Sequence, residues 1–340
     1  MHTHRRCVCL YFYPMKKSLY LLLAAVLFVG CHRDEKTDEP VGPFVFFETR
    51  VGETGTLPQR EGEAFGVFGY HFNEDTLTNV FEDYSDRIAK VAWDAEDQAF
   101  SYENLVKWSE GTYSFHAYYP YAYKNQDRLA VVENEGSNTL HFVQPCELDD
   151  MVDLMTASVE SMTRTLESVR LQFKPQLFSV DVVIANHDDM HSEAPGITIL
   201  DAEIDFVGVP QSLNYDFECS RCTVSAETVR INEDLFAASE DFYLGTGMEY
   251  NFTKELGNPF MLIPSDGIKY SIAIEYMGED GESDIYTYPE DSDWASLGNV
   301  AKAGEHYAIV INTSSSTSHP FTASLVADWE EKVDIDNDFN

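Results

Sequence analysis

The sequence predicts an all-β protein with two antiparallel β-sandwich domains in tandem. Apolar and polar residues alternate with a period of two in many segments, as in Val169-Arg170-Leu171-Gln172-Phe173, and this is the pattern of a strand with one buried face. Aromatic residues are frequent, with 19 Tyr and 22 Phe, whereas long helical periodicity is absent. A length of 340 residues suits about two domains.

The predicted strands follow one another along the chain, separated by residues that favour turns, such as Gly278-Glu279-Asp280-Gly281. Short helical turns are expected at Asn73–Tyr84, Asn104–Ser109 and Asn232–Ala238. The strands are Phe44–Glu48, Phe65–Phe72, Ile88–Trp93, Thr112–Tyr119, Leu140–Val143, Val169–Phe173, Phe178–Ala185, Gly196–Ile204, Phe260–Ile263, Tyr270–Tyr276, Tyr307–Ile311 and Phe321–Trp329. A polar break near Met162–Thr165 divides them, which gives an N-terminal sandwich over residues 44–164 and a C-terminal one over 165–340.

Residues 1–30 are predicted to be a signal peptide, with Met15 as an alternative start of translation. Lys16 and Lys17 precede an apolar run of about a dozen residues, which is too short to span a bilayer comfortably. The run ends in Leu27-Phe28-Val29-Gly30-Cys31, which resembles a lipobox. The resemblance implies cleavage before Cys31 and acylation of its thiol by a fatty acid such as palmitate. The alternative is an ordinary signal peptide with an incidental cysteine.

Residues 31–43 begin with a polar run that reads as a flexible, lipidated tether. The acidic residues just behind Cys31 resemble the surface-export signal of some Gram-negative lipoproteins. We therefore expect an outer-membrane lipoprotein that faces the outside of the cell. The formal net charge of −37 argues against partners that are themselves anionic, nucleic acid and anionic lipid surfaces among them.

Motifs that could carry chemistry are few, and we expect no enzyme, no cofactor and no metal site. His187 and His191 have the i, i+4 spacing of a helical zinc site. They follow a predicted strand, however, and Pro195-Gly196 leaves too little room for a helix, so a polar hairpin loop is favoured. Asp334, Asp336 and Asp338 alternate like the start of a calcium loop, but the chain ends before the twelfth-position Glu.

Cys219 and Cys222 form a lone CxxC pair without a second pair for zinc. We expect either a local disulfide in an oxidising compartment or two inert thiols. Seven aromatic residues gather between Trp108 and Tyr123. They could form a carbohydrate-binding platform, but Tyr113 and Phe115 share one face of a strand, so filling the core is the favoured interpretation.

Several segments, taken in order, resemble one known family. Trp108-Ser109-Glu110-Gly111-Thr112-Tyr113-Ser114-Phe115-His116-Ala117-Tyr118-Tyr119-Pro120 resembles a W-x-x-G-x-Y-x-F-x-A-Y-Y-P signature of fimbrillin-like pilus subunits, and Ala64–Tyr70 resembles the strand that opens their first domain. Asp153–Ala157, Phe260–Pro264 and Ser324–Trp329 fit in the same order. The matches extend from about Phe44 to Trp329, nearly the whole chain after Cys31.

The resemblance implies two transthyretin-like sandwiches, secretion as an acylated precursor, and a place among the subunits of a type V pilus. An arginine-specific protease would remove the first strand, Val41–Thr49, by cutting at Arg50 or alternatively at Arg60. The alternative for Arg50 is a plain strand-end arginine without this role. A strand from a neighbouring subunit would then fill the vacated groove, because an unfilled groove exposes unpaired backbone and apolar side chains.

The resemblance places the donor strand at Phe321–Asn340, where Phe321, Ala323, Leu325 and Ala327 alternate as groove filling demands. Residues 334–340 are strongly acidic and would not fill an apolar groove, which leaves open a role as an anchor or tip subunit. The partners implied are other pilus subunits, the outer membrane through the lipid, and a host or bacterial surface ligand. The alternative is a monomeric surface lipoprotein that binds glycans or host protein through aromatics near Tyr118–Tyr123.

Overall fold

The computed structural model describes residues 44–52, 55–121, 128–134, 137–186, 196–235, 242–244, 252–278, 280–290, 294–298, 302–313 and 321–327. All of them belong to one compact unit, Pro43–Asn340. Within these ranges no helix has the length and apolar character needed to cross a membrane. The helical elements described are two single 3₁₀ turns, η1 (Ser85–Arg87) and η3 (Leu148–Asp150).

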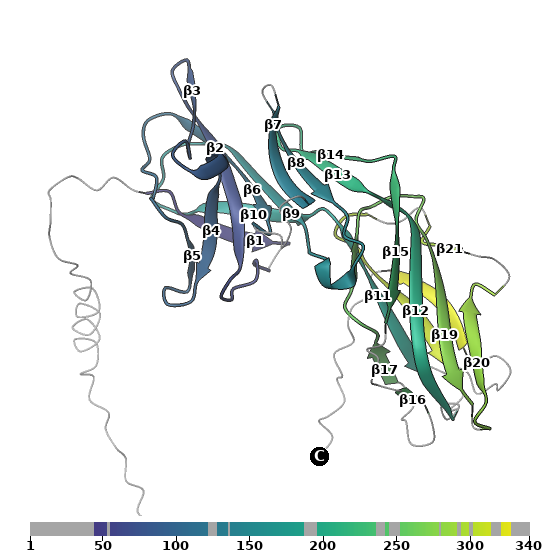
Figure 1. Cartoon of the computed structure of the whole chain (residues 1–340). Coiled ribbons are helices and arrows are strands. Elements are labelled where there is room, and N and C mark those ends of the chain that lie inside the picture. Colours follow the sequence, from purple (N-terminus) through teal and green to yellow (C-terminus); the bar gives the residue numbers. More distant parts are fainter. Residues whose placement is uncertain are drawn as a thin grey trace, which may run out of the picture. The chain divides into compact units, whose positions relative to one another are not determined.

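The first half of the chain builds an eight-stranded sheet. Its strands are β1 (Phe47–Val51), β2 (Ala64–Asn73), β3 (Thr76–Asn79), β4 (Ala89–Asp94), β5 (Ala99–Ser101), β6 (Thr112–Tyr119), β9 (Met155–Met162) and β10 (Val169–Pro175). Their order is β1-β10-β9-β6-β2-β4-β5, and β3 pairs with β2 (Figure 1). β1 and β5, at the two ends of this order, contact each other, so the sheet curls around its own core.

Side chains that alternate along these strands fill that core, as the period of two requires. On β6 the core side is occupied by Tyr113, Phe115, Ala117 and Tyr119, and on β2 by Phe65 and its alternating neighbours. The opposite face of the sheet carries Phe68 and Tyr118, which belong to a second cluster.

A four-stranded sheet covers this opposite face. Its strands are β7 (Leu129–Asn134), β8 (Ser137–Val143), β13 (Ser212–Asp216) and β14 (Arg221–Val224), in the order β14-β13-β8-β7. Leu140 and Phe142 on β8, with Leu213 and Tyr215 on β13, pack against Phe68 of β2.

The remaining strands form two further sheets. The five-stranded sheet consists of β11 (Phe178–Asn186), β17 (Phe252–Glu255), β18 (Phe260–Leu262), β22 (His306–Thr313) and β23 (Phe321–Ala327), and the six-stranded sheet of β12 (Ile197–Pro210), β15 (Thr228–Asp234), β16 (Phe242–Leu244), β19 (Lys269–Met277), β20 (Ser283–Tyr288) and β21 (Ala295–Ser296). In the latter sheet β12 is the longest strand and pairs with β19, which pairs in turn with β20 (Figure 1). Apolar side chains of both sheets meet in one core, which makes this region a β-sandwich.

The predicted all-β class is confirmed. β6 spans Thr112–Tyr119 as expected, but the ladder of the first strand begins at Phe47 rather than Phe44. The helical turn expected at Asn73–Tyr84 is wrong, because β3 folds back on β2 with Asn73 opposite Thr76. The helical turn expected to begin at Asn232 is also wrong at its start, because Asn232 lies inside β15. The segment Asn104–Ser109, where another helical turn was expected, is irregular apart from one bridge at Lys107.

Two features of the pairing depart from a simple antiparallel tandem. The pairs β1–β10 and β11–β22 are parallel, which long connections permit. The strands also interleave across the boundary expected at residue 164: β10 pairs with β9 and β1, and β13 pairs with β8. The division into domains 44–164 and 165–340 stays a prediction.

Candidate functional site

The segment 44–51 lies in a slot at one edge of the eight-stranded sheet. On one side β1 pairs in parallel with β10, with Phe47 opposite Val169. On the other side the backbone N–H of Val45 donates to the carbonyl oxygen of Val106 at 2.9 Å. Backbone hydrogen bonds therefore hold this segment from both sides, although it is first in the sequence.

Side chains of this segment alternate between core and solvent. Val45, Phe47 and Thr49 are buried, and Phe47 is only 6% exposed, whereas its neighbour Phe46 is 45% exposed. Full burial of a Val or Phe side chain contributes about 1.5–3 kcal/mol. The first strand is consequently attached by its apolar face as well as by its backbone.

Aromatic rings form the wall that Phe47 contacts. Its ring centroid lies 5.4 Å from that of Phe115, edge to face, and 5.8 Å from that of Tyr102. The hydroxyl of Tyr102 donates to the carbonyl oxygen of Val45 at 2.7 Å, and burial raises the pKa of this phenol. If β1 left, these rings and the edge of β10 would be uncovered.

Arg50, the predicted cleavage residue, lies inside β1 rather than after it. Its backbone is paired with Gln172 of β10, and its side chain is 38% exposed. The guanidinium lies 2.9 Å from Glu48 Oε1, while Arg170 lies 3.7 Å from the other oxygen of Glu48. A protease that cuts here must first pull hydrogen-bonded strand out of the sheet.

Arg60, the alternative residue, lies in the turn that precedes β2. Its side chain is 77% exposed, and its Nε lies 2.8 Å from Glu63 Oε1. Glu63 also accepts a hydrogen bond from the Tyr119 hydroxyl at 2.7 Å, and buried Leu57 fixes the start of the loop. The loop is thus tethered at its base and presents the arginine to solvent.

A partly buried carboxyl group, that of Asp153, lies close enough to Tyr119 to influence its pKa. Asp153, in the segment before β9, has one oxygen that is buried and has no hydrogen-bond partner among the described residues. Burial raises the pKa of Asp153 to about 6, and its charge contributes to the raised pKa of Tyr119. This acid costs the folded protein free energy when it is ionised.

The predicted donor residues belong to β23, an edge strand paired antiparallel with β22 of the same chain. Phe321 is fully buried, and its ring contacts those of Tyr276 and Tyr286, each at a centroid distance of 5.4 Å. Here the strand fills a place in its own sandwich.

Beyond Phe321 the alternation weakens. Ala323 and Leu325 are half-buried between exposed neighbours, and Leu325 packs on the core, whereas Ala327 is exposed. Residues 328–340, including Asp334, Asp336 and Asp338, lie outside the described residues.

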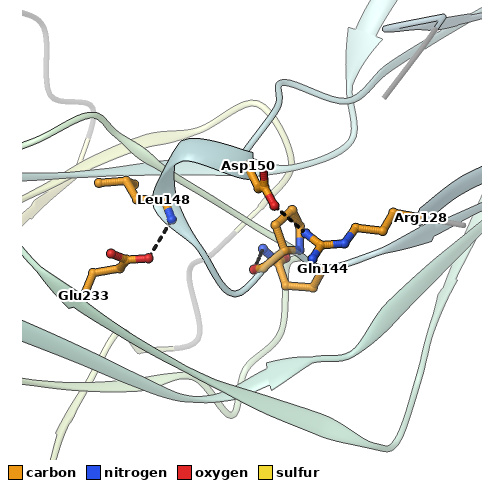
Figure 2. Close-up of polar contacts among 6 residues, drawn as sticks. Arg128, Gln144, Leu148, Asp150 and Glu233 are labelled. Atoms are coloured by element: carbon orange, nitrogen blue, oxygen red, sulfur yellow. Dashed lines mark hydrogen bonds and ion pairs between the residues drawn. The ribbon is translucent and has the colours of Figure 1, made fainter. Parts of the chain in front are cut away.

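A polar clamp fixes the connection between β8 and β9, and Figure 2 shows part of it. The backbone N–H of Leu148 donates to Glu233 Oε1 at 2.6 Å, and Arg128 lies 3.3 Å from Asp150. Gln144 donates to the carbonyl of Met261 at 3.0 Å and accepts the N–H of Ile263, also at 3.0 Å. These residues were not identified from the sequence. Gln144, a polar residue directly after the apolar end of β8, is the one signal that could have indicated them.

The remaining sequence predictions fall in three groups. Cys219 and Cys222 are free thiols in the structure: Cys222 donates to Gln176 Oε1 at 3.1 Å, and a disulfide between the two cysteines stays a prediction. Tyr113 and Phe115 are buried in the core, which confirms the favoured interpretation of the aromatic segment. Other predicted residues lie outside the described residues, namely Cys31, Tyr123, His187 and His191.

Groups of three or more His, Cys, Asp or Glu that could hold a metal ion are absent from the described ranges. The arrangement itself consists of a buried first strand at a sheet edge, an exposed Arg60 in the loop that follows it, and the edge strand β23 near the other end of the chain.

Comparisons with known proteins find similar solved structures and one matching family. No curated protein matches the chain significantly. Among solved structures, a fimbrial protein from Bacteroides vulgatus matches with a TM-score of 0.56 at 14% identity, over 84% of this chain and 99% of that one. A Bacteroides ovatus protein assigned to cell adhesion matches with a TM-score of 0.50 at 13% identity, over 86% and 99%. At such identities these matches show a shared fold.

The sequence itself decides the family. The model of the fimbrillin-like family matches residues 49–329, from within β1 to just beyond β23. This range includes every sheet described above. The chain therefore belongs to the fimbrillin-like family.

Proposed function

We propose that this chain is a subunit of a cell-surface fimbrium, exported as a lipoprotein and assembled by removal of its first strand and donation of a strand from a neighbour. Its biological output would be adhesion rather than catalysis. One observation carries the proposal: the segment 44–51 fills an apolar slot at a sheet edge and is joined to the next strand by a loop that exposes Arg60.

Loss of the first strand would leave a sheet edge and an apolar surface that another strand could cover. Removal of Val45 and Phe47 would expose the rings of Tyr102 and Phe115 and the unpaired backbone edge of β10. Both are costly in water, and an added strand with apolar residues at alternate positions satisfies both.

Exposure favours Arg60 over Arg50 as the first cut. A cut after Arg60 breaks the chain in a solvent-exposed turn and separates all of β1 from β2. A cut after Arg50 needs β1 to open first, because that residue is paired with β10. We infer that Arg50 becomes accessible only through local opening of the sheet edge.

The same cut has a consequence for anchoring. Cys31, the predicted lipidation residue, precedes both arginines in the sequence. A lipidated chain that is cut at either position leaves its lipid on the released N-terminal piece. An uncut chain at the outer membrane would stay anchored, so proteolysis would decide between an anchored and a released subunit.

The donor in this proposal is β23, which supplies Phe321, Ala323 and Leu325 at alternate positions. To act on a neighbour, β23 must leave the rings of Tyr276 and Tyr286. Strand donation is therefore coupled to partial opening of the subunit's own C-terminal sandwich.

Limited digestion of the chain from His32 to Asn340 with an arginine-specific protease tests this proposal. Mass spectrometry follows the cut, and size-exclusion chromatography follows assembly. We expect an early cut at Arg60, then ladders of oligomers. Arg60→Gln should delay both, whereas Arg164→Gln, in the exposed loop before β10, serves as the control and should leave both unchanged.

Two results would contradict the proposal. If the first strand separates completely under native conditions and the chain does not self-associate, a polymerising role is ruled out. If the chain resists digestion near both Arg50 and Arg60, excision of the first strand is ruled out. The alternative, a monomeric surface lipoprotein that binds glycans or host protein, would then be favoured.

A further inference from the structure

A cavity of about 460 Å³ opens on the outer face of the eight-stranded sheet, away from the first strand. It lies where the cover provided by the four-stranded sheet ends. Phe68 of β2 is beneath that cover and is 2% exposed, whereas Phe72, four residues further along the same face, is 48% exposed. The residues used below come from β2, β6, β9 and the end of β13: Tyr70, Phe72, His116, Glu160, Phe217 and Glu218.

The inner wall of the cavity is aromatic and fixed by packing. Phe217 is buried and meets Phe68 and Tyr215 edge to face, each at a centroid distance of 5.0 Å. His116 stacks on Phe68 at 5.2 Å. The hydroxyl of Tyr70 accepts a hydrogen bond from the side-chain amide of Asn138. These contacts preform the cavity before any ligand arrives.

The ionisable groups that line the cavity give it a negative character. Glu160 and Glu218 are the carboxylates of the lining, and Lys and Arg are absent among its described residues. Neither carboxylate forms an ion pair with a described residue. Burial lowers the pKa of His116, so the imidazole, whose Nδ1 lies 3.0 Å from Ser158 Oγ, is neutral at pH 7.

We propose that this cavity binds an organic cation, an alkylammonium or a guanidinium group. The rings of Tyr70 and Phe72, which line the cavity, attract a cation through their quadrupoles, and Glu160 and Glu218 neutralise its charge. An anionic ligand would meet two carboxylates and no cation. The cation could be a lysine or arginine side chain of a partner protein or a free polyamine.

The test uses the full chain and three probes: Nα-acetyl-lysine amide, Nα-acetyl-arginine amide and spermidine, titrated by calorimetry in about 150 mM salt. At this ionic strength the Debye length is about 8 Å, so diffuse attraction to the acidic surface is screened. Glu160→Gln with Glu218→Gln should weaken binding by about tenfold or more. The control pair Glu227→Gln with Glu282→Gln changes the net charge equally outside the cavity and should change affinity less than about twofold.

The outcomes separate cleanly. Tighter binding of the amino acid amides than of spermidine identifies a protein side chain as the source, and the reverse order identifies a free polyamine. Equal weakening in both double variants would overturn the proposal, because the cations would then bind the acidic surface at large. Binding of neutral glucose or galactose with no response to the cations would also overturn it. Phe72→Ala, at an exposed position that does not endanger folding, should weaken binding by about threefold.

Discussion

The two edge strands at opposite ends of the chain differ in how they are held. β1 brings Val45, Phe47 and Thr49 into a core and is bonded along both sides at its start. β23 buries only Phe321 completely, and the burial of its side chains fades toward Ala327. The difference teaches that β1 is held by buried side chains along its length, whereas β23 is held mainly at Phe321 and can fray from its Ala327 end.

The largest effect should come from the aromatic anchor of β1. Phe47→Ala removes a ring that packs against Phe115 and Tyr102, and we expect a loss of about 3–5 kcal/mol in the free energy of unfolding. Denaturant titration measures it, and Phe46→Ala, at the exposed neighbour, should cost under about 1 kcal/mol. Equal losses at the two positions would break the comparison.

The partly buried acid Asp153, in the segment before β9, should produce the next largest effect. Ionised Asp153 is destabilising because its folded pKa of about 6 lies above the ordinary value of 3.8. The folded protein therefore binds the extra proton, so the contribution of Asp153 to stability is complete below about pH 4 and is lost as the pH rises from about 4 to about 6. Asp153→Asn should add up to about 3 kcal/mol at pH 7 and nothing below pH 4.

The far end of the molecule offers a matched contrast for that prediction. Asp181 of β11 is buried too, more completely than Asp153, but its carboxylate lies 2.6 Å from His306 Nε2 of β22. Unfolding measured between pH 4 and pH 8 should show no gain from Asp181→Asn at pH 7, because the change removes a paired acid. A gain in stability of similar size in both variants would show that the hydrogen-bond partner of Asp181 does not offset the cost of burying its charge, and would contradict this contrast.

The outer half of β23 should show a smaller effect than the anchor of β1. Leu325→Ala removes a half-buried side chain and should cost about 1–2 kcal/mol. Val326→Ala, on the solvent side of the same strand, should cost less than about 0.5 kcal/mol. Hydrogen exchange of the β23 amides should then accelerate in Leu325→Ala alone.

The smallest effect concerns the ion pairs on the outer face of β1. Arg50 and Glu48 are each about two-fifths exposed, so solvent screens their attraction, and Arg50→Gln should lower stability by less than about 0.5 kcal/mol. Circular dichroism melting is sufficient to measure it. A larger loss would mean that the charges, rather than the apolar face, attach the strand.

Local patterns predicted several strands whose alternation is unbroken, although β13, which alternates as regularly, was missed. β6 was placed to the residue because Tyr113, Phe115, Ala117 and Tyr119 alternate with the residues of the other face. β9 was missed because polar residues occupy part of its core-distal face, where Thr156 is buried through a hydrogen bond from Gln176. Burial of a polar residue depends on a partner 20 residues away, which no local period reports.

The site was predictable in its residues but not in its geometry. The sequence indicated both Arg50 and Arg60, and only the pairing of β1 with β10, more than a hundred residues later, shows that one is in a strand and the other in an exposed turn. The cavity at Tyr70 and Phe217 likewise requires two sheets to meet. Pairings between residues so far apart in the sequence belong to the tertiary structure, and local sequence patterns do not predict them.

The parallel pairing of β1 with β10 also determines how the molecule carries load. If Cys31 carries the proposed lipid anchor, tension between that anchor and the later strands enters at the N-terminal end of β1 and leaves at the C-terminal end of β10. In a parallel pair these ends are opposite, so the five paired positions from Phe47 to Val51 are sheared together instead of being unzipped one at a time. An uncut, lipid-anchored chain would therefore resist flow at the cell surface with its whole first strand.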